Sequence, residues 1–180
     1  MLRPVARRAK DQGMRMRAYL SMAFADPWDG PTPLKVAVDA GHALLDLGAD
    51  ELSIGDTIGA ATPGKVQDLV DAYLASGVPA ERLAVHFHDT YGQGLANVLA
   101  AMELGVSVVD ASAGGLGGSP YAKGAAGNLA TEDLVWMLEG LGIRTGIDVR
   151  ALAATALWIC GELGRETPGR AARALAPPPA

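Results

Sequence analysis

Two of the three histidines in the chain stand one residue apart, in the segment LAVHFHDTYGQGLAN at residues 83–97. If this segment begins as a β-strand, His86 and His88 point to one face and the apolar residues between and before them point to the other. Two imidazoles that project together from the carboxyl end of a strand are able to clamp a metal ion. The alternative is two histidines satisfied within the protein, one in the core and one bonded to a loop. A metal is favoured, because two buried rings without partners would leave polar atoms unpaired at about 1–3 kcal/mol each.

A second segment that could contribute to a functional site is the glycine-rich stretch GGLGGSPYAKGAAGNLATED at residues 114–133. Glycine lets the backbone approach a ligand closely and lets a loop move over it. By itself the stretch is equally typical of a plain flexible connection. Together with the histidine strand it predicts one wall of a shared pocket.

The composition narrows the class of protein and the kind of partner. Of the 180 residues, 49% are apolar and 19% are charged, which is typical of a globular domain. The formal net charge of -5 provides no basic field, so we expect no nucleic-acid partner. No apolar run approaches the roughly 18 residues that cross a bilayer, so we expect no membrane partner. Small molecules are the expected ligands.

The single cysteine, Cys160, excludes an intrachain disulfide and a multi-cysteine zinc site. It suits a reducing compartment, and we expect a cytoplasmic protein. The opening MLRPVARRAK is rich in arginine, as transit peptides are, but Asp11 follows at once and a strand-like run comes without a spacer. We interpret the opening as the end of a solvated helix.

Short apolar runs alternate along the chain with longer stretches at helical spacing. The apolar runs are residues 14–24, 51–56, 83–88 and 106–113, and the helical stretches that follow them are residues 33–47, 63–75, 93–104 and 131–141. The threonines before Pro33 and Pro63 are predicted helix caps, and Asp148 is predicted to cap a last helix that ends near Leu163. Four strand–helix repeats predict an α/β fold with a parallel sheet.

The number of repeats suggests part of a barrel. A closed (β/α)8 barrel needs eight strands and about 250 residues, and this chain supplies about half, so the sheet is either open or half a barrel. An open doubly wound sheet usually carries its glycine-rich turn after the first strand, whereas here that turn follows the last. The pattern favours a half barrel with a C-terminal helix over residues 1–163, followed by a flexible Pro/Ala tail at residues 164–180.

Three segments resemble a known family: ELSIGDTIGAATPG, HFHDTYGQGLAN and GVSVVDASAGGLGGSPYAKGAAGNLATEDLVWMLEGLGI. They are similar to the C-terminal half of the hydroxymethylglutaryl-CoA lyases, metal-dependent TIM-barrel lyases related to pyruvate carboxyltransferase domains. The resemblance runs from about Arg3 to Leu163. The motifs are specific, because the related isopropylmalate and homocitrate synthases share the His-x-His strand but close the last loop with a short Gly-Glu-Arg type turn.

This resemblance implies a fold, a reaction and a set of site residues. The fold is the C-terminal half of a TIM (β/α)8 barrel, and the reaction is metal-dependent cleavage of an acyl-CoA, 3-hydroxy-3-methylglutaryl-CoA, to acetyl-CoA and acetoacetate. His86 and His88 match metal ligands, and Asn128 matches a third ligand through its side-chain oxygen, for Mg²⁺ or Mn²⁺. Asp56 and Glu132 match acids that affect catalysis, although a plain first-turn helix carboxylate remains the alternative for Glu132.

Two departures from the family bear on the activity. Ser119 stands where the family has a loop cysteine for acid/base work, and a thiol has a pKa of about 8.5 whereas that of an aliphatic hydroxyl is far higher. Ser119 is therefore either a poor substitute or a contact to a different substrate. The Arg–Asp pair that the family carries on its first strand, with the Asp as a metal ligand, has no counterpart here. We therefore expect the chain alone to be catalytically impaired or inactive.

Three hypotheses stay open at this point. The first is an acyl-CoA lyase or related aldolase, represented by its C-terminal half. The second is a non-catalytic half barrel that pairs its sheet edges with a missing N-terminal half or in a homodimer. The third is a zinc hydrolase of the amidohydrolase type, which also uses His-x-His but carries it on the first barrel strand.

Overall fold

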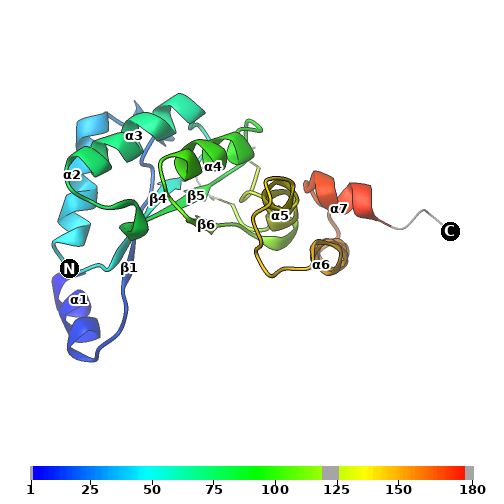
Figure 1. Ribbon diagram of the computed structural model, residues 1–180, viewed down its shortest axis with the longest axis horizontal. Coiled ribbons are helices and arrows are strands. Elements are labelled where there is room, and N and C mark those ends of the chain that lie inside the picture. The colour runs from blue at the N-terminus through cyan, green and yellow to red at the C-terminus, as the bar shows by residue number, and fades with distance from the viewer. Residues whose placement is uncertain (1, 119–125, 177–180) are drawn as a thin grey trace. The chain divides into compact units, whose positions relative to one another are not determined.

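The computed structural model describes residues 2–118 and 126–176, which form two compact units, Met1–Asp110 and Ala111–Ala180. The first unit holds a four-stranded sheet in the order β1-β4-β5-β6, in which each strand is parallel to its neighbour (Figure 1). The strands are β1 (Arg17–Leu20), β4 (Glu51–Asp56), β5 (Leu83–Phe87) and β6 (Val108–Asp110). This arrangement confirms the predicted α/β fold with a parallel sheet.

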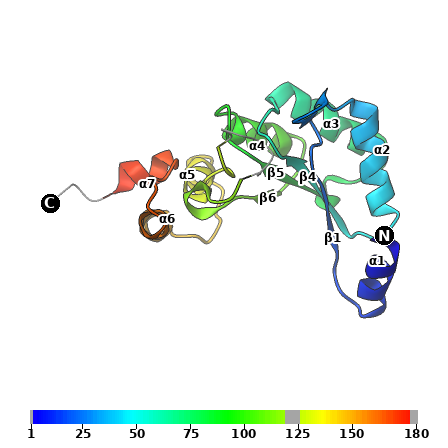
Figure 2. The ribbon, with the colours of Figure 1, turned by 180° about the vertical axis from the view of Figure 1, so that it is seen from behind.

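Helices of the first unit cover one face of this sheet. They are α2 (Leu34–Leu45), α3 (Pro63–Ala75) and α4 (Gly94–Glu103), with a 3-10 turn η1 (Ala80–Arg82) before β5. Helix α2 packs against β1 and β4, α4 packs against β5, and α3 contacts both α2 and α4 (Figures 1 and 2). Another helix, α1 (Leu2–Asp11), precedes β1. Its residues are mostly exposed, so the opening is helical and solvated, and the helix spans the opening as a whole instead of only ending there.

The first strand is shorter than the sequence predicts. It ends at Leu20, and Met22 then adopts a left-handed backbone conformation with a φ of 55°. The chain continues into a small antiparallel hairpin of β2 (Ala25–Asp26) and β3 (Gly30–Pro31). The prediction of one continuous strand over residues 14–24 is therefore wrong, because apolar content alone does not reveal a reversal of the backbone.

The apolar face of the sheet meets the helices and forms the core of the first unit. Leu52 and Ile54 of β4 and Val85 of β5 have no exposed surface, and Tyr73 of α3 is equally buried. The Tyr73 hydroxyl donates a hydrogen bond of 2.7 Å to the carbonyl oxygen of Ala37 in α2, which satisfies its polar atom. The alternate residues of the strands face the other side of the sheet, where the candidate site lies.

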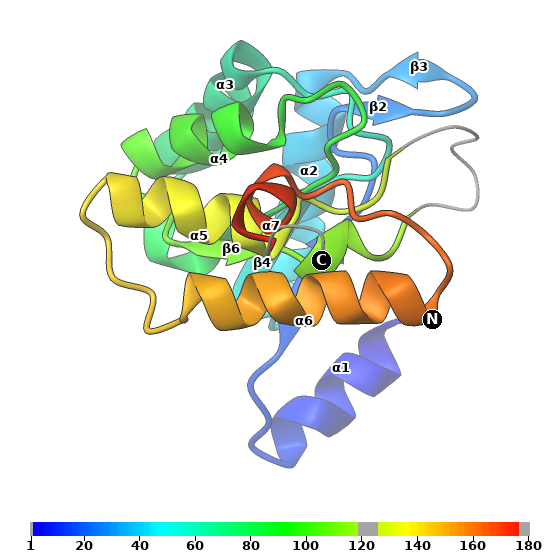
Figure 3. The ribbon, with the colours of Figure 1, turned by 90° about the vertical axis from the view of Figure 1, so that its right-hand side faces the viewer.

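Three helices make up most of the second unit. A 3-10 turn η2 (Ala113–Gly115) leads toward α5 (Thr131–Gly140), α6 (Val149–Glu162) and α7 (Arg170–Leu175), which lie side by side in Figure 3. Ala153 and Ala156 of α6 and Ala172 of α7 form a buried cluster. The expectation of a flexible tail is therefore wrong for residues 170–175, because small side chains on α6 and α7 let these helices pack closely. Among the described residues, no helix is long and apolar enough to span a bilayer.

One of the three predicted helix caps is present, and the other two are not. Asp148 caps α6 as predicted, because its carboxylate accepts the amides of Arg150 at 2.9 Å and Ala151 at 3.2 Å. The hydroxyl caps predicted at Thr32 and Thr62 are wrong. Thr62 occupies the cap position of α3 without a side-chain bond, and the Thr32 hydroxyl donates to a carbonyl oxygen in the β1–β2 loop instead.

Candidate functional site

Both histidines of the predicted pair lie at the carboxyl end of β5. His86 is registered with Gly55 of β4 and Asp110 of β6, and registered partners in parallel strands share a face. His88 follows the strand directly, and the centroids of the His86 and His88 rings are 5.5 Å apart at an interplanar angle of 49°. The two rings therefore lie together, as the alternation of the strand predicts.

Polar side chains of neighbouring strands surround His86. Its Nδ1 lies 3.5 Å from Oδ2 of Asp110, and the ring of Tyr19 meets it edge-on at a centroid distance of 6.2 Å. The Asp110 carboxylate also accepts hydrogen bonds from Arg17 Nη1 at 2.8 Å and from Ser53 Oγ at 3.2 Å. Four strands thus contribute side chains to one polar patch on the side of the sheet away from the helices.

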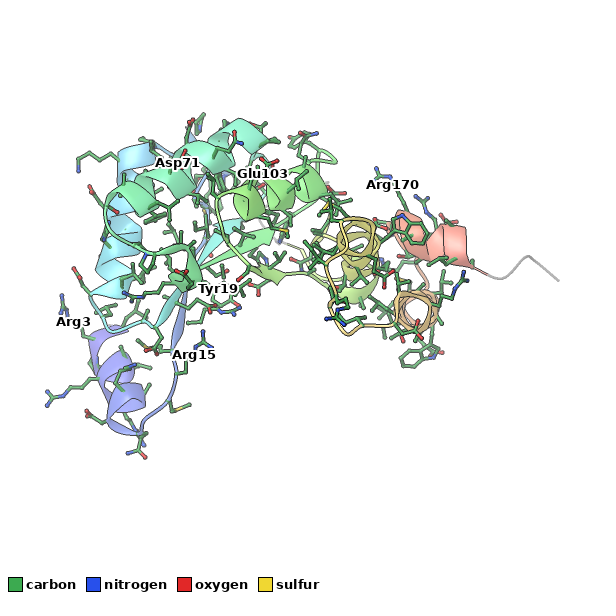
Figure 4. All side chains as sticks on the ribbon, in the orientation of Figure 1. Arg3, Arg15, Tyr19, Asp71, Glu103 and Arg170 are labelled. Atoms are coloured by element: carbon green, nitrogen blue, oxygen red, sulfur yellow. The ribbon has the colours of Figure 1, made fainter. Side chains whose placement is uncertain are left out.

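A chain of opposite charges extends this patch toward the start of the strands. Glu51 is only 2% exposed and forms ion pairs with Arg17 and with Arg15, the latter at 2.8 Å. The pKa of Arg17 is raised by a hydrogen bond to the Tyr19 hydroxyl and by the nearby carboxylates, so the guanidinium stays charged. In Figure 4, Arg15 and Tyr19 lie on the opposite side of the strands from Asp71 of α3.

His88 is the more buried of the two histidines, with 5% of its surface exposed. Among the described residues, its Nδ1 is buried and has no hydrogen-bond partner. Burial and the neighbouring His86 both lower the pKa of His88, so its ring is neutral at pH 7. A neutral imidazole is the form that binds a metal ion.

Asp56, which the resemblance marks as a catalytic acid, holds the loop after β4. It is 1% exposed, and its two carboxylate oxygens accept the amides of Ala60 and Ala61, each at 2.9 Å. Burial raises the pKa of Asp56, and the amide hydrogen bonds oppose that rise. Both oxygens are engaged by the backbone, which is the arrangement of a residue that shapes a loop.

Asn128 belongs to the second unit, in the stem of the glycine-rich segment. Its Nδ2 donates to the carbonyl oxygen of Leu116 at 2.8 Å, while its Oδ1 is buried without a partner among the described residues. A Cβ at Gly117, whose φ is +88°, would lie 2.7 Å from this Nδ2. Glycine is therefore required where the stem passes Asn128. Ser119, the predicted acid/base residue, lies outside the described residues.

Glu132 lies in the first turn of α5 and has no exposed surface. Its Oε2 accepts the amide of Gly114 at 3.0 Å, and the Thr167 hydroxyl lies 3.4 Å from Oε1. The neighbouring Asp133 accepts the amides of Arg170 and Ala171 and so caps α7. Within the second unit these two acids tie the start of the glycine-rich segment and the C-terminal helix to α5.

Sequence reasoning missed the residues that surround His86. Asp110, Arg17 and Tyr19 come from β6 and β1, and their relation to the histidine becomes visible only through strand register. The signal for Asp110 is an acid at the carboxyl end of a strand-like run, while Arg17 carries no such signal. In the part of the chain that is described, no three His, Cys, Asp or Glu residues form a cluster able to hold a metal.

Comparisons with known proteins agree with the motifs. A family model described as HMGL-like matches residues 1–159. The mitochondrial hydroxymethylglutaryl-CoA lyase of Arabidopsis thaliana is 51% identical over 174 residues, which cover 96% of this chain and 37% of that protein. The mitochondrial hydroxymethylglutaryl-CoA lyase of Rattus norvegicus is 50% identical over 171 residues, which cover 94% of this chain and 52% of that protein.

A solved structure shows the same fold. The crystal structure of hydroxymethylglutaryl-CoA lyase from Pseudomonas aeruginosa matches with a TM-score of 0.90 at 46% identity and covers 97% of this chain and 58% of that chain. The likeness confirms the predicted fold class, part of a TIM-barrel lyase, and the resemblance carried by the sequence motifs. The chain spans about half the length of most of these relatives.

Replacing Glu132 by Ala tests its structural role. We expect Glu132→Ala to lower the free energy of unfolding by about 1–3 kcal/mol, because the buried Gly114 amide loses its acceptor. Urea denaturation followed by circular dichroism measures the change. Glu139→Ala, on the exposed face of the same helix, is the control and should stay within about 0.5 kcal/mol of wild type. Equal effects of the two substitutions would contradict this role for Glu132.

Proposed function

Because the chain belongs to the HMGL-like family, we propose that it forms the metal-binding part of a lyase that cleaves 3-hydroxy-3-methylglutaryl-CoA into acetyl-CoA and acetoacetate. The observation that carries the proposal is the histidine pair at the end of β5, where a buried ring nitrogen of His88 has no partner among the described residues. A third histidine, His42, lies on α2 and hydrogen-bonds with Ser76, so it does not belong to this pair.

The donor atoms of the chain fit a divalent cation. His86 and His88 lie side by side, and Asn128 offers a buried amide oxygen that makes no hydrogen bond with the described residues. His86 and His88 would supply two nitrogen ligands to Mg²⁺ or Mn²⁺, and Asn128 is the third ligand that the family resemblance implies. When bound, such an ion polarises the hydroxyl and carboxylate of the acyl group.

In this proposal, the two acids that the resemblance marks as catalytic hold loops in place. Asp56 fixes the loop after β4, and Glu132 fixes the start of the glycine-rich segment at Gly114. Both therefore shape loops at the carboxyl ends of strands, where barrel enzymes bind their substrates. Loss of either acid would reduce activity through loop geometry.

Ser119 bears on the choice of substrate. A serine hydroxyl has a much higher pKa than a cysteine thiol and is correspondingly poor at donating a proton to a carbon centre. With Ser119 in the place of the family's cysteine, either cleavage of 3-hydroxy-3-methylglutaryl-CoA is slow or the hydroxyl contacts the acyl group of a related acyl-CoA.

A second candidate function is pairing with a complementary chain. Within the described residues β1 is paired only with β4, so its other edge is open. Beside this edge runs a groove of about 270 Å³, lined mostly by apolar side chains that include Leu2, Val5 and Leu44. Leu2 and Val5 are 59% and 69% exposed. A parallel strand added to β1 would cover the edge and the groove, and the remaining length of the lyase barrel is the proposed source of that strand.

Manganese titration followed by EPR tests the metal site. We expect wild type to bind Mn²⁺, and His86→Ala and His88→Ala to bind it at least about tenfold more weakly, because each loses a ligand nitrogen. His42→Ala is the matched control, since it removes the histidine that lies outside the pair. Equal binding by wild type and His86→Ala would remove the metal site from the proposal.

A lyase assay tests the reaction and the serine. We expect the Mn²⁺-loaded chain to release acetoacetate from 3-hydroxy-3-methylglutaryl-CoA slowly, and Ser119→Cys to raise the rate by about 10²-fold or more, because a thiol restores general acid/base transfer. Ser107→Cys, which adds an exposed thiol in the first unit, is the control. Absence of acetoacetate with both wild type and Ser119→Cys would contradict lyase activity for this chain by itself.

Sedimentation equilibrium tests the pairing function. We expect the purified chain to sediment above its monomer mass of 18.5 kDa, because a second copy covers the open edge and groove when no complementary chain is present. Val5→Glu should shift the mass toward the monomer. Val36→Glu, at an exposed position of α2 that is 55% exposed, should not. A wild-type protein that stays monomeric at all concentrations argues against pairing.

A further inference from the structure

Asp110 is the point where the polar patch of the first unit converges. Its Oδ1 accepts Arg17 Nη1 at 2.8 Å, its Oδ2 accepts Ser53 Oγ at 3.2 Å, and the same Oδ2 lies 3.5 Å from His86 Nδ1. The carboxylate is 22% exposed at its side chain, so protein groups rather than water supply most of its contacts. It is the one carboxylate in the described residues that faces a ring nitrogen of the histidine pair.

The chemistry of the carboxylate decides which nitrogen of His86 carries the proton. An ionised carboxylate only accepts hydrogen bonds, so the ring nitrogen that faces it is stabilised as a donor. That nitrogen is Nδ1. A neutral imidazole has a single N–H, so protonation at Nδ1 leaves the lone pair on Nε2.

Neighbouring side chains limit the freedom of the carboxylate and of the ring. Ser53 is fully buried, and Arg17 is held by Glu51, which is 2% exposed and is also paired with Arg15. Both oxygens of Asp110 therefore accept hydrogen bonds from side chains whose own positions are fixed by burial or by an ion pair. The Tyr19 ring also contacts His86, in a T-shaped arrangement with the ring centroids 6.2 Å apart.

We propose that Asp110 is a positioning residue that holds His86 as its Nδ1–H tautomer and thereby presents Nε2 to a divalent cation. Arg17 and Ser53 keep the carboxylate in place for this task. The part of the inference that concerns the cation rests on the proposed function, whereas the tautomer is a property of the protein without metal. Carboxylate–histidine pairs of this kind orient ligands in metal sites and change metal affinity when they are broken.

The tautomer is measured by ¹⁵N NMR of the metal-free protein, at a pH where the histidine rings are neutral. We expect wild-type His86 to show a protonated Nδ1 and an unprotonated Nε2. In Asp110→Asn, the side-chain amide offers an N–H to Nδ1, and we expect His86 to change to the Nε2–H form. His42, bonded to Ser76, is an internal reference whose signals should stay unchanged.

Two control variants separate the carboxylate from general damage to the fold. Ser53→Ala removes one donor to Asp110 but keeps the carboxylate, so His86 should remain in its Nδ1–H form. Asp39→Asn removes an exposed carboxylate of α2 and should change neither the tautomer nor the circular dichroism spectrum. A wild-type His86 that is protonated at Nε2, or an unchanged tautomer in Asp110→Asn, overturns the inference.

Manganese affinity supplies the second readout. We expect Asp110→Asn to weaken Mn²⁺ binding by about 10- to 100-fold, and Asp39→Asn to leave it unchanged. If wild type binds no Mn²⁺ while the tautomer changes as expected, the proposed metal site fails and the positioning of His86 stands. If Mn²⁺ binds equally well to wild type and Asp110→Asn, the positioning role fails and the metal site stands.

Discussion

The buried charge of Glu51 governs the open face of the sheet in the first unit. A carboxylate that is only 2% exposed has lost nearly all its hydration, and it is tolerated only because Arg15 and Arg17 compensate it. Arg17 also reaches Asp110, so the compensation continues across the strands to the side of His86. The surroundings of the histidine are thus part of one charge network that starts at the opposite end of β4.

In the second unit, backbone amides stabilise buried carboxylates. Glu132 is completely buried, and it has no basic partner among the described contacts; a glycine amide and a threonine hydroxyl surround its oxygens. The Asp133 carboxylate likewise accepts the backbone amides of Arg170 and Ala171 at the start of α7. Carboxylates in the first turn of α5 therefore do more than face the helix dipole, because they connect segments on either side of α5 in the sequence. The bond of Glu132 to the Gly114 amide fixes the start of the glycine-rich segment against α5.

This length of chain provides two features of the proposed lyase, namely metal ligands and an open sheet edge. In the proposed function the two histidines of the first unit would supply neutral nitrogen donors, which hold a hard cation only modestly when no carboxylate joins them. The open edge of β1 and the apolar groove beside it are exposed surfaces of the kind that a further strand covers in a closed barrel. Metal affinity and barrel closure are therefore linked in the proposed function.

The sequence by itself determined the histidine strand β5, the cap of α6 and the family. The two-residue period of β5 placed His86 and His88 together, and the cap at Asp148 followed from contacts two and three residues away. Such features are readable because they depend on neighbours along the chain. The motif segments were long and specific enough to identify the lyase resemblance before any fold was known.

Only the tertiary structure decided which residues from distant parts of the chain contact one another. Arg17 and Asp110 are 93 positions apart and meet because β1 and β6 join the same sheet, a contact that no local periodicity announces. The Thr32 hydroxyl donates to a carbonyl oxygen ten residues away instead of capping a helix. Residues 170–175 form a helix that packs through Ala172 against alanines of α6. In each case a long-range partner offered a better hydrogen bond or packing contact than the local sequence did, and long-range partners exist only once the chain has folded.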